Sequence, residues 1–144
     1  MNNLRLRYLL SLETPERLAQ LAQLSDTERY EVRHHWRLFA RDAQAAPPGE
    51  WTTWLMMAGR GFGKTRAGAE WVREIAHRDP TARIALVGAS LGEVRAVMVE
   101  GESGLLAISP PGRAPQFEPS LRRLQWANGA QATLFSLRLA RRHG

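Results

Sequence analysis

The sequence predicts an α/β fold with a mainly parallel sheet, and three observations lead to it. Two apolar runs, residues 51–58 and 83–88, have the composition of buried strands. A segment with helical periodicity follows Lys64 and ends at Asp79-Pro80, and another spans residues 90–100. An order of strand, helix, strand, helix requires parallel strands joined by crossover helices. The length of 144 residues suits a single domain of ordinary size.

A helical arm is expected over residues 1–49, before the first strand. Proline at the first helical position predicts a short helix over residues 14–23. Residues 25–28, Ser-Asp-Thr-Glu, have the spacing of a capping box and predict a longer helix towards Asp42. The sequence Ala-Ala-Pro-Pro-Gly at 45–49 then separates the arm from the rest of the chain.

A β-hairpin is expected around Asn128 and Gly129. A three-residue loop at 127–129, with Gly129 left-handed, separates polar from apolar residues, whereas a two-residue loop mixes them on both faces. The longer loop puts these apolar residues on one face: Leu124, Trp126, Ala130, Ala132 and Leu134. The opposite face receives Arg123, Gln125, Gln131 and Thr133.

A glycine-rich loop joins the first strand to its helix. It consists of Ala58, Gly59, Arg60, Gly61, Phe62, Gly63, Lys64 and Thr65. A small residue, four further residues and then Gly-Lys-Thr is the spacing of a phosphate-binding loop (Walker A), with Ala58 replacing the usual first glycine. The three glycines allow the backbone N–H groups to point inward at an anion, and the helix adds its positive N-terminal end.

This loop predicts an ATP site. Lys64 is expected to contact the β- and γ-phosphates, and the Thr65 hydroxyl to ligate Mg²⁺. Nineteen of the twenty basic residues are arginine, and the only lysine, Lys64, lies at the position where the motif requires one. A compact ammonium fits such a site better than a planar guanidinium.

Several segments resemble the large terminase subunit of tailed bacteriophages, prophages and gene-transfer agents. They are the loop itself, Trp-x-x-Trp-Leu at 51–55, and residues 66–72, 84–87, 94–106 and 124–130. The resemblance covers about residues 33–136. It implies a DNA-packaging motor with an amino-terminal ATPase of P-loop NTPase type and a carboxyl-terminal nuclease of RNase H-like fold.

The resemblance also implies roles for single residues. Residues 59–65 correspond to the family's nucleotide cradle. Arg60 is similar to an arginine proposed to stabilise charge on the γ-phosphate, and a solvent-facing loop arginine is the alternative. Gln44 is similar to a glutamine that reads adenine, and a polar linker residue is the alternative. The implied cofactors are ATP and Mg²⁺, and the family's partners are double-stranded DNA, the small terminase subunit and the portal.

Hydrolysis by this class needs a carboxylate at the end of a downstream strand, and no aspartate follows Asp79. Glu100 ends an apolar run but continues the helix from Ser90, so we reject it as this carboxylate. The family continues into an acidic strand after Ser136, whereas this sequence has a basic tail at 137–144. We therefore expect a partial ATPase domain at 50–136, without an acidic strand or a nuclease domain, followed by an aberrant tail.

Composition narrows the remaining options. The absence of cysteine excludes disulfides, a zinc ribbon and a thiol nucleophile. Residues 112–144 carry most of the net charge of +6, and a solvated tail is preferred to a DNA-binding face. Arg122 and Arg123 are candidates for DNA contact, but at least Arg123 lies on the polar face of the expected hairpin and needs no such function. Without a signal peptide or membrane span, a cytoplasmic location is expected.

Aromatic and histidine residues near these motifs are expected to be structural. Trp51, Trp54 and Trp71 are predicted to pack in the core and not to stack on a base. His34 and His35 have no partner at metal-ligand spacing.

The expected function is ATP binding by the amino-terminal portion of a terminase-like packaging motor, with weak or no turnover. The first alternative is a small stand-alone nucleotide kinase or NTPase, which would need an acidic strand. The second is a non-enzymatic remnant that binds only protein partners.

Overall fold

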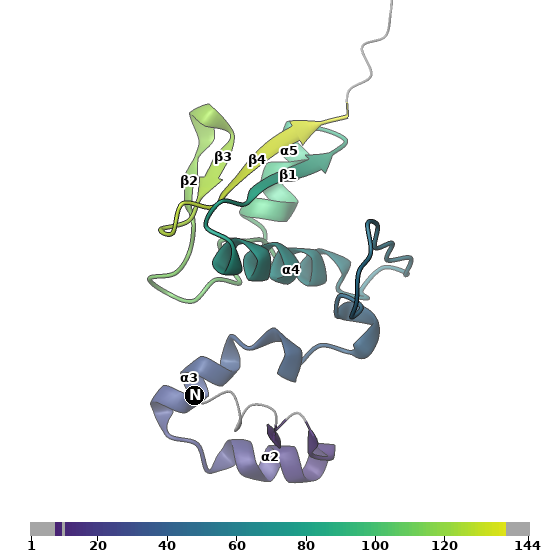
Figure 1. Cartoon of the computed structure of the whole chain (residues 1–144), viewed down its shortest axis with the longest axis vertical. Coiled ribbons are helices and arrows are strands. Elements are labelled where there is room, and N and C mark those ends of the chain that lie inside the picture. The colour runs from purple at the N-terminus through teal and green to yellow at the C-terminus, as the bar shows by residue number, and fades with distance from the viewer. Residues whose placement is uncertain (1–7, 10, 138–144) are drawn as a thin grey trace, which may run out of the picture. The chain divides into compact units, whose positions relative to one another are not determined.

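A computed structural model of the chain describes residues 8–9 and 11–137 (Figure 1). The chain forms two compact units, Met1–Thr52 and Thr53–Gly144. Most of the basic tail expected at 137–144 lies outside the described residues, as do the first seven residues of the helical arm. Within the part that is described, no helix has the length and apolar content needed to cross a membrane.

The first unit is helical. Its elements are α2 (Thr14–Ala22), α3 (Asp26–Arg33) and two short 3₁₀ helices, η1 (Trp36–Leu38) and η2 (Asp42–Gln44). The capping box is confirmed, because the Ser25 N–H donates to Glu28 Oε2 (3.0 Å) and the Glu28 N–H to Ser25 Oγ (3.3 Å). The helix predicted over residues 14–23 is confirmed to within one residue.

The helix predicted to run towards Asp42 is wrong, because α3 ends at Arg33. Val32 and Leu38 are both buried in the small core of this unit. On a straight helix these two side chains, six residues apart, would point to different faces. The chain therefore leaves the helix after α3 and turns, so that both apolar side chains reach the same core.

The second unit carries the sheet. Its elements are α4 (Lys64–Arg78), β1 (Arg83–Gly88), α5 (Leu91–Glu93), the π-helical turn η3 (Val94–Val99), β2 (Gln116–Glu118), the 3₁₀ helix η4 (Pro119–Leu121), β3 (Arg123–Gln125) and β4 (Gln131–Ser136). The strand order is β1-β4-β3-β2. The predicted α/β class is confirmed in this coarse sense.

The expectation of a mainly parallel sheet is wrong. Only β1 and β4 are parallel, with Leu86 opposite Leu134, whereas β4 pairs with β3, and β3 with β2, in antiparallel fashion. The reason is that β2, β3 and β4 form a meander joined by short connections, and only the long connection from β1 through α5 and η3 to β2 crosses the sheet.

The strand predicted at 51–58 is also wrong. Residues 51–58 form no strand, and residues 53–58 form no other regular structure. Leu55 and Met57 are 74% and 83% exposed. Strand-like composition gives a strand only where a partner supplies the ladder hydrogen bonds, and none of the described strands pairs with this segment.

The predicted hairpin is confirmed in register. Leu124 lies opposite Ala132, the Trp126 N–H donates to the Ala130 carbonyl (3.0 Å), and Gly129 has a φ of 105°. The five apolar residues of its inner face are buried, while the four polar residues of the other face are only partly covered.

The core of the second unit lies between the sheet, α4 and the α5–η3 segment. The helix predicted over residues 90–100 is confirmed, with Ser90 as its N-cap and a π-helical turn over most of its length. Gly104 allows the following turn to pack closely, since a Cβ there would lie 2.6 Å from the Val99 carbonyl oxygen. The largest fully buried side chains of this core are Val94, Val99, Leu105 and Leu124.

Candidate functional site

The glycine-rich loop leads directly into α4, and its conformation depends on two of its three glycines. Gly61 (φ 76°) and Gly63 (φ 88°) are left-handed, and Gly63 is the N-cap of the helix. Gly59 has no positive φ, so the expectation that all three glycines are needed for the curl holds only for the last two. A Cβ at Gly59 or Gly61 would meet no atom within 4 Å, which leaves the loop open.

Lys64 is the first residue of α4 and closes the loop on itself. Its Nζ donates to the carbonyl oxygens of Ala58 (2.6 Å) and Gly59 (2.7 Å). The Ala67 N–H donates to the Gly63 carbonyl (2.9 Å) and begins the helical hydrogen bonding. The N–H groups of the preceding residues of the first turn have no helical acceptor, which is the condition for an anion site at a helix start.

The remaining loop residues lie near solvent. Arg60 and Thr65 are exposed, and Phe62 is half-buried. The described part of the chain has no group of three or more His, Cys, Asp or Glu residues that could hold a metal ion. Among residues 58–65, the Thr65 hydroxyl is the one side-chain oxygen that could ligate a hard metal ion.

Gln44 belongs to the first unit. Its side chain is buried, and its Oε1 accepts a hydrogen bond from the Arg41 N–H (2.9 Å), which caps η2. The adenine-reading role of Gln44 remains a prediction. In this structure the side-chain oxygen of Gln44 is already hydrogen-bonded to the backbone of Arg41. Trp51, in the same unit, donates from its Nε1 to the Pro47 carbonyl (3.0 Å).

An apolar cavity of about 400 Å³ lies along the inner side of α4, beginning at Lys64 and Thr65. It is lined by Trp71 and Val72 of α4, by residues 85–87 of β1, and by side chains from η3. Trp54 and Trp71 meet edge to face with ring centroids 6.4 Å apart, as expected of tryptophans that pack structurally.

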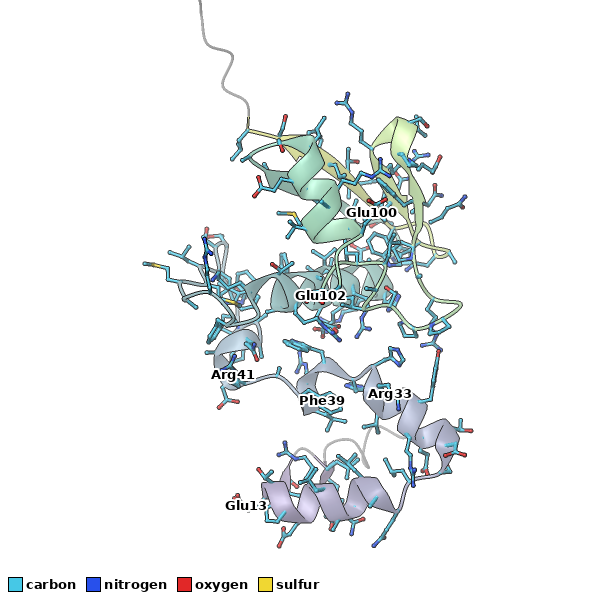
Figure 2. All side chains as sticks on the ribbon, turned by 180° about the vertical axis from the view of Figure 1, so that it is seen from behind. Glu13, Arg33, Phe39, Arg41, Glu100 and Glu102 are labelled. Atoms are coloured by element: carbon cyan, nitrogen blue, oxygen red, sulfur yellow. The ribbon has the colours of Figure 1, made fainter. Side chains whose placement is uncertain are left out.

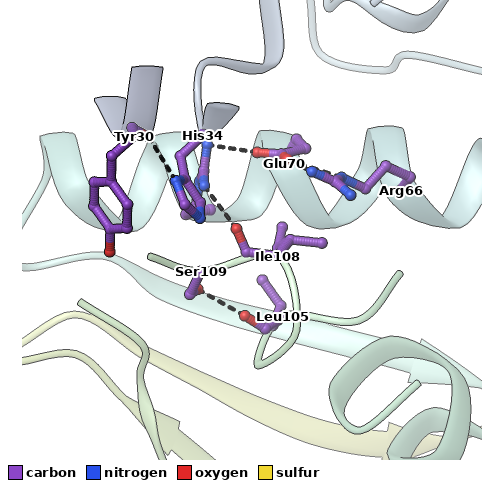
Figure 3. A network of polar contacts seen from close by, with 8 residues as sticks. Tyr30, His34, Arg66, Glu70, Leu105, Ile108 and Ser109 are labelled. Carbon is purple, nitrogen blue, oxygen red and sulfur yellow. Dashed lines mark hydrogen bonds and ion pairs between the residues drawn. The ribbon is translucent and has the colours of Figure 1, made fainter. Parts of the chain in front are cut away.

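A charged network centred on Glu70 of α4 was not predicted from the sequence. Glu70 is only 2% exposed. Its Oε1 lies 2.8 Å from Arg66, its Oε2 lies 2.7 Å from Arg73, and Arg73 also donates to the Ile108 carbonyl (2.9 Å) (Figure 3). The signal was present in the sequence, because opposite charges spaced by four and three residues face each other on a helix.

Burial lowers the pKa of the Arg73 guanidinium, and the negative charge of Glu70 opposes this shift. The Glu70 Oε2 accepts no well-directed hydrogen bond, so its link to Arg73 is an ion pair in character. The single buried carboxylate of Glu70 thus pairs with the guanidinium groups of both Arg66 and Arg73.

The rejection of Glu100 as a catalytic carboxylate is confirmed in its structural part, since Glu100 follows the helical turn η3 and no strand (Figure 2). Both its oxygens accept from Arg95, at 2.9 and 3.0 Å, and this hydrogen bonding lowers the pKa of the Glu100 carboxyl.

Two other residues discussed from the sequence have local partners. The Nδ1 atom of His34 lies 3.0 Å from the Tyr30 carbonyl oxygen, and Arg123 forms an ion pair with Glu118 (3.1 Å).

Comparison with known proteins identifies the family. The sequence profile described as terminase large subunit, T4likevirus-type, N-terminal, matches residues 55–144, which is more than half of the chain and includes the loop and α4. No curated protein and no solved structure matches the sequence. The chain therefore belongs to the family of T4-like-virus-type terminase large subunits and corresponds to their amino-terminal region.

Proposed function

We propose that this chain binds ATP as the amino-terminal portion of a viral DNA-packaging motor. The observation that carries the proposal is the loop with two left-handed glycines that ends in Lys64, at the start of a 15-residue helix. A phosphate group at this point would meet N–H donors, the positive end of the helix and an ammonium group together. Membership of the terminase family supports the choice of packaging as the process.

Each loop residue has a definite task in this proposal. On binding, the Lys64 ammonium would turn from the carbonyls of Ala58 and Gly59 to the β- and γ-phosphate oxygens. Thr65 would ligate Mg²⁺, whose charge offsets that of the phosphates. Arg60, exposed in the loop, would reach the γ-phosphate.

Turnover is not expected from these residues. In the described residues, β1 is followed by Ala89 and Ser90, and Glu100 is held by Arg95. Glu118, which ends β2, is the one carboxylate at the end of a described strand, and it is paired with Arg123 (3.1 Å). The described residues after β1 therefore offer no unengaged carboxylate to orient Mg²⁺ or a water molecule there. In the packaging complex, the partners we propose are double-stranded DNA, the small terminase subunit and the portal.

The first prediction tests the nucleotide site with Lys64→Ala. We expect the variant to lose measurable affinity for a non-hydrolysable ATP analogue with Mg²⁺ in titration calorimetry, because the only ammonium at the loop is removed. Arg78→Ala is the matched control, since it removes one positive charge at the other end of the same helix. Equal binding by the wild type and Lys64→Ala would refute the site.

A turnover assay with ATP, run beside this titration, separates the two alternatives. Steady release of phosphate from ATP by the purified chain, absent in Lys64→Ala, would favour a stand-alone NTPase. Failure of the wild type to bind any nucleotide would favour a remnant that contacts only proteins.

A further inference from the structure

Glu70 is the buried acidic residue that lies nearest in sequence to the phosphate-binding loop, one helical turn after Arg66. Arg66 is the third residue of α4 and follows Lys64 and Thr65 directly. Its guanidinium contacts Glu70 through two nitrogens, Nε at 2.9 Å and an Nη at 2.8 Å (Figure 3). The Arg66 side chain is therefore directed along the helix, towards Glu70 and away from the loop.

A cation in the first turn of a helix opposes the helix dipole and so destabilises that turn. The first turn of α4 contains two cations, Lys64 and Arg66, and no acidic residue. Lys64 donates to two loop carbonyls, whereas Arg66 is paired with the Glu70 carboxylate.

We infer that Glu70 is a positioning residue for nucleotide binding, an inference that rests on the function proposed above. By pairing with Arg66, its carboxylate keeps the first turn of α4 intact, and with it the N–H groups that face a bound phosphate. The hydrogen bond from the Ala67 N–H to the Gly63 carbonyl (2.9 Å) reports on this turn, because it joins the helix to the loop.

Glu70 also pairs with Arg73, which donates to the Ile108 carbonyl. This second contact ties α4 to the turn after η3, where Ser109 Oγ donates to the Leu105 carbonyl (2.7 Å). A substitution of Glu70 would weaken both contacts, so a test of the positioning role has to separate the Arg66 contact from the Arg73 contact.

The second prediction compares Glu70→Gln with Glu74→Gln. Glu74 lies on the same helix and pairs with Arg78 in the same i, i+4 arrangement, far from the loop. Without nucleotide, Glu70→Gln should speed hydrogen exchange of the Ala67 amide relative to Glu74→Gln. It should also weaken binding of the Mg²⁺–ATP analogue by roughly fivefold, the effect of about 1 kcal/mol at a helix terminus.

A rescue experiment distinguishes a positioning role of Glu70 from a merely structural one. In the double variant Arg66→Gln/Glu70→Gln the cation that Glu70 pairs with is removed together with the carboxylate, so affinity and Ala67 protection should return to near the wild-type values. Failure of this rescue would overturn the inference, because the loss would then act through Arg73. If the wild type binds no nucleotide, the proposed function fails, whereas the exchange rates of the Ala67 amide still show whether Glu70 stabilises the first turn of α4.

Discussion

Lys64 uses the geometry of an ammonium group at the start of α4. Two of its three N–H donors reach carbonyl oxygens, at 2.6 and 2.7 Å, on adjacent residues of the chain. A guanidinium has its donors in one plane and on a larger group, so an arginine would have to reshape the loop to make both contacts. The presence of lysine here, in a chain that otherwise uses arginine, follows from this requirement.

The third prediction concerns the loop glycines. Gly61→Ala should lower the free energy of unfolding by about 1 to 2 kcal/mol, because alanine is strained in the left-handed conformation. Gly59→Ala is the matched control: it has the same open surroundings without a positive φ, and should be neutral or slightly stabilising. Urea denaturation of both variants checks this, and equal loss of stability in the two would show that the conformation of Gly61 is not the cause.

At the scale of residues, sequence reasoning placed the glycine-rich loop directly before the helix that became α4, but it missed Glu70. The loop follows from spacing alone, since Gly-Lys-Thr after a small residue is specified locally. The burial of Glu70 depends on the packing of α4 and on the carbonyl of Ile108, which is far away in the sequence. A helical pattern that counts charged residues as exposed cannot show that two arginines bury a carboxylate between them.

At the scale of elements, the end of α4 carries a pH-sensitive group. Burial lowers the pKa of His77, and the charge of Arg73 lowers it further, while a hydrogen bond with the Arg113 backbone opposes the shift. The folded state therefore favours neutral His77, and the unfolded state binds a proton more readily.

The fourth prediction follows from that sign. Stability should be highest above the ordinary histidine pKa of 6.5 and should fall as the pH drops below it, towards the lower folded-state value. His77→Gln should flatten this dependence in thermal melts between pH 5 and 8. Asp79 titrates below 3.8, outside this window, because hydrogen bonds from Thr81 lower its pKa. An unchanged slope in His77→Gln would assign the dependence to other groups.

The hairpin and the segment at 51–58 show which elements a sequence can specify. The hairpin was predicted in register because its information is local: Gly129 sets the turn, and the alternation on either side sets the faces. Asn128 then fixes it to α4 through a hydrogen bond to the Ala76 carbonyl (2.8 Å). The segment at 51–58 has strand-like residues, but its state depends on a distant partner strand.

At the scale of the whole molecule, the sheet ends in a strand with an open side. Among the described strands, β1 is outermost and pairs only with β4. Val87 on this strand is 42% exposed. Unpaired strand edges with apolar side chains promote association between chains. The prediction of a mainly parallel sheet was wrong at this scale. Strand order depends on pairing between segments that are distant in sequence, and hydrophobic periodicity carries no information about that pairing.

The fifth prediction is that the chain self-associates through this edge. Light scattering should show a mass that rises with concentration, and Val87→Lys should reduce it, because a charged side chain on an edge strand resists pairing. Leu18→Lys, at a 62% exposed apolar position on α2, is the matched control and should leave the association unchanged. A monomeric mass at every concentration would show that the open edge of β1 does not cause self-association.

The single lysine at the head of α4 also makes the loop chemically addressable. Apart from the terminal amino group, Lys64 is the only primary amine in the sequence, so an amine-selective acylating reagent has one internal target. Acylation there would convert the ammonium into a neutral amide and would compete directly with any occupant of the loop. The rate of labelling, read by mass spectrometry, would thus serve as a footprint of the loop even in a mixture with other proteins.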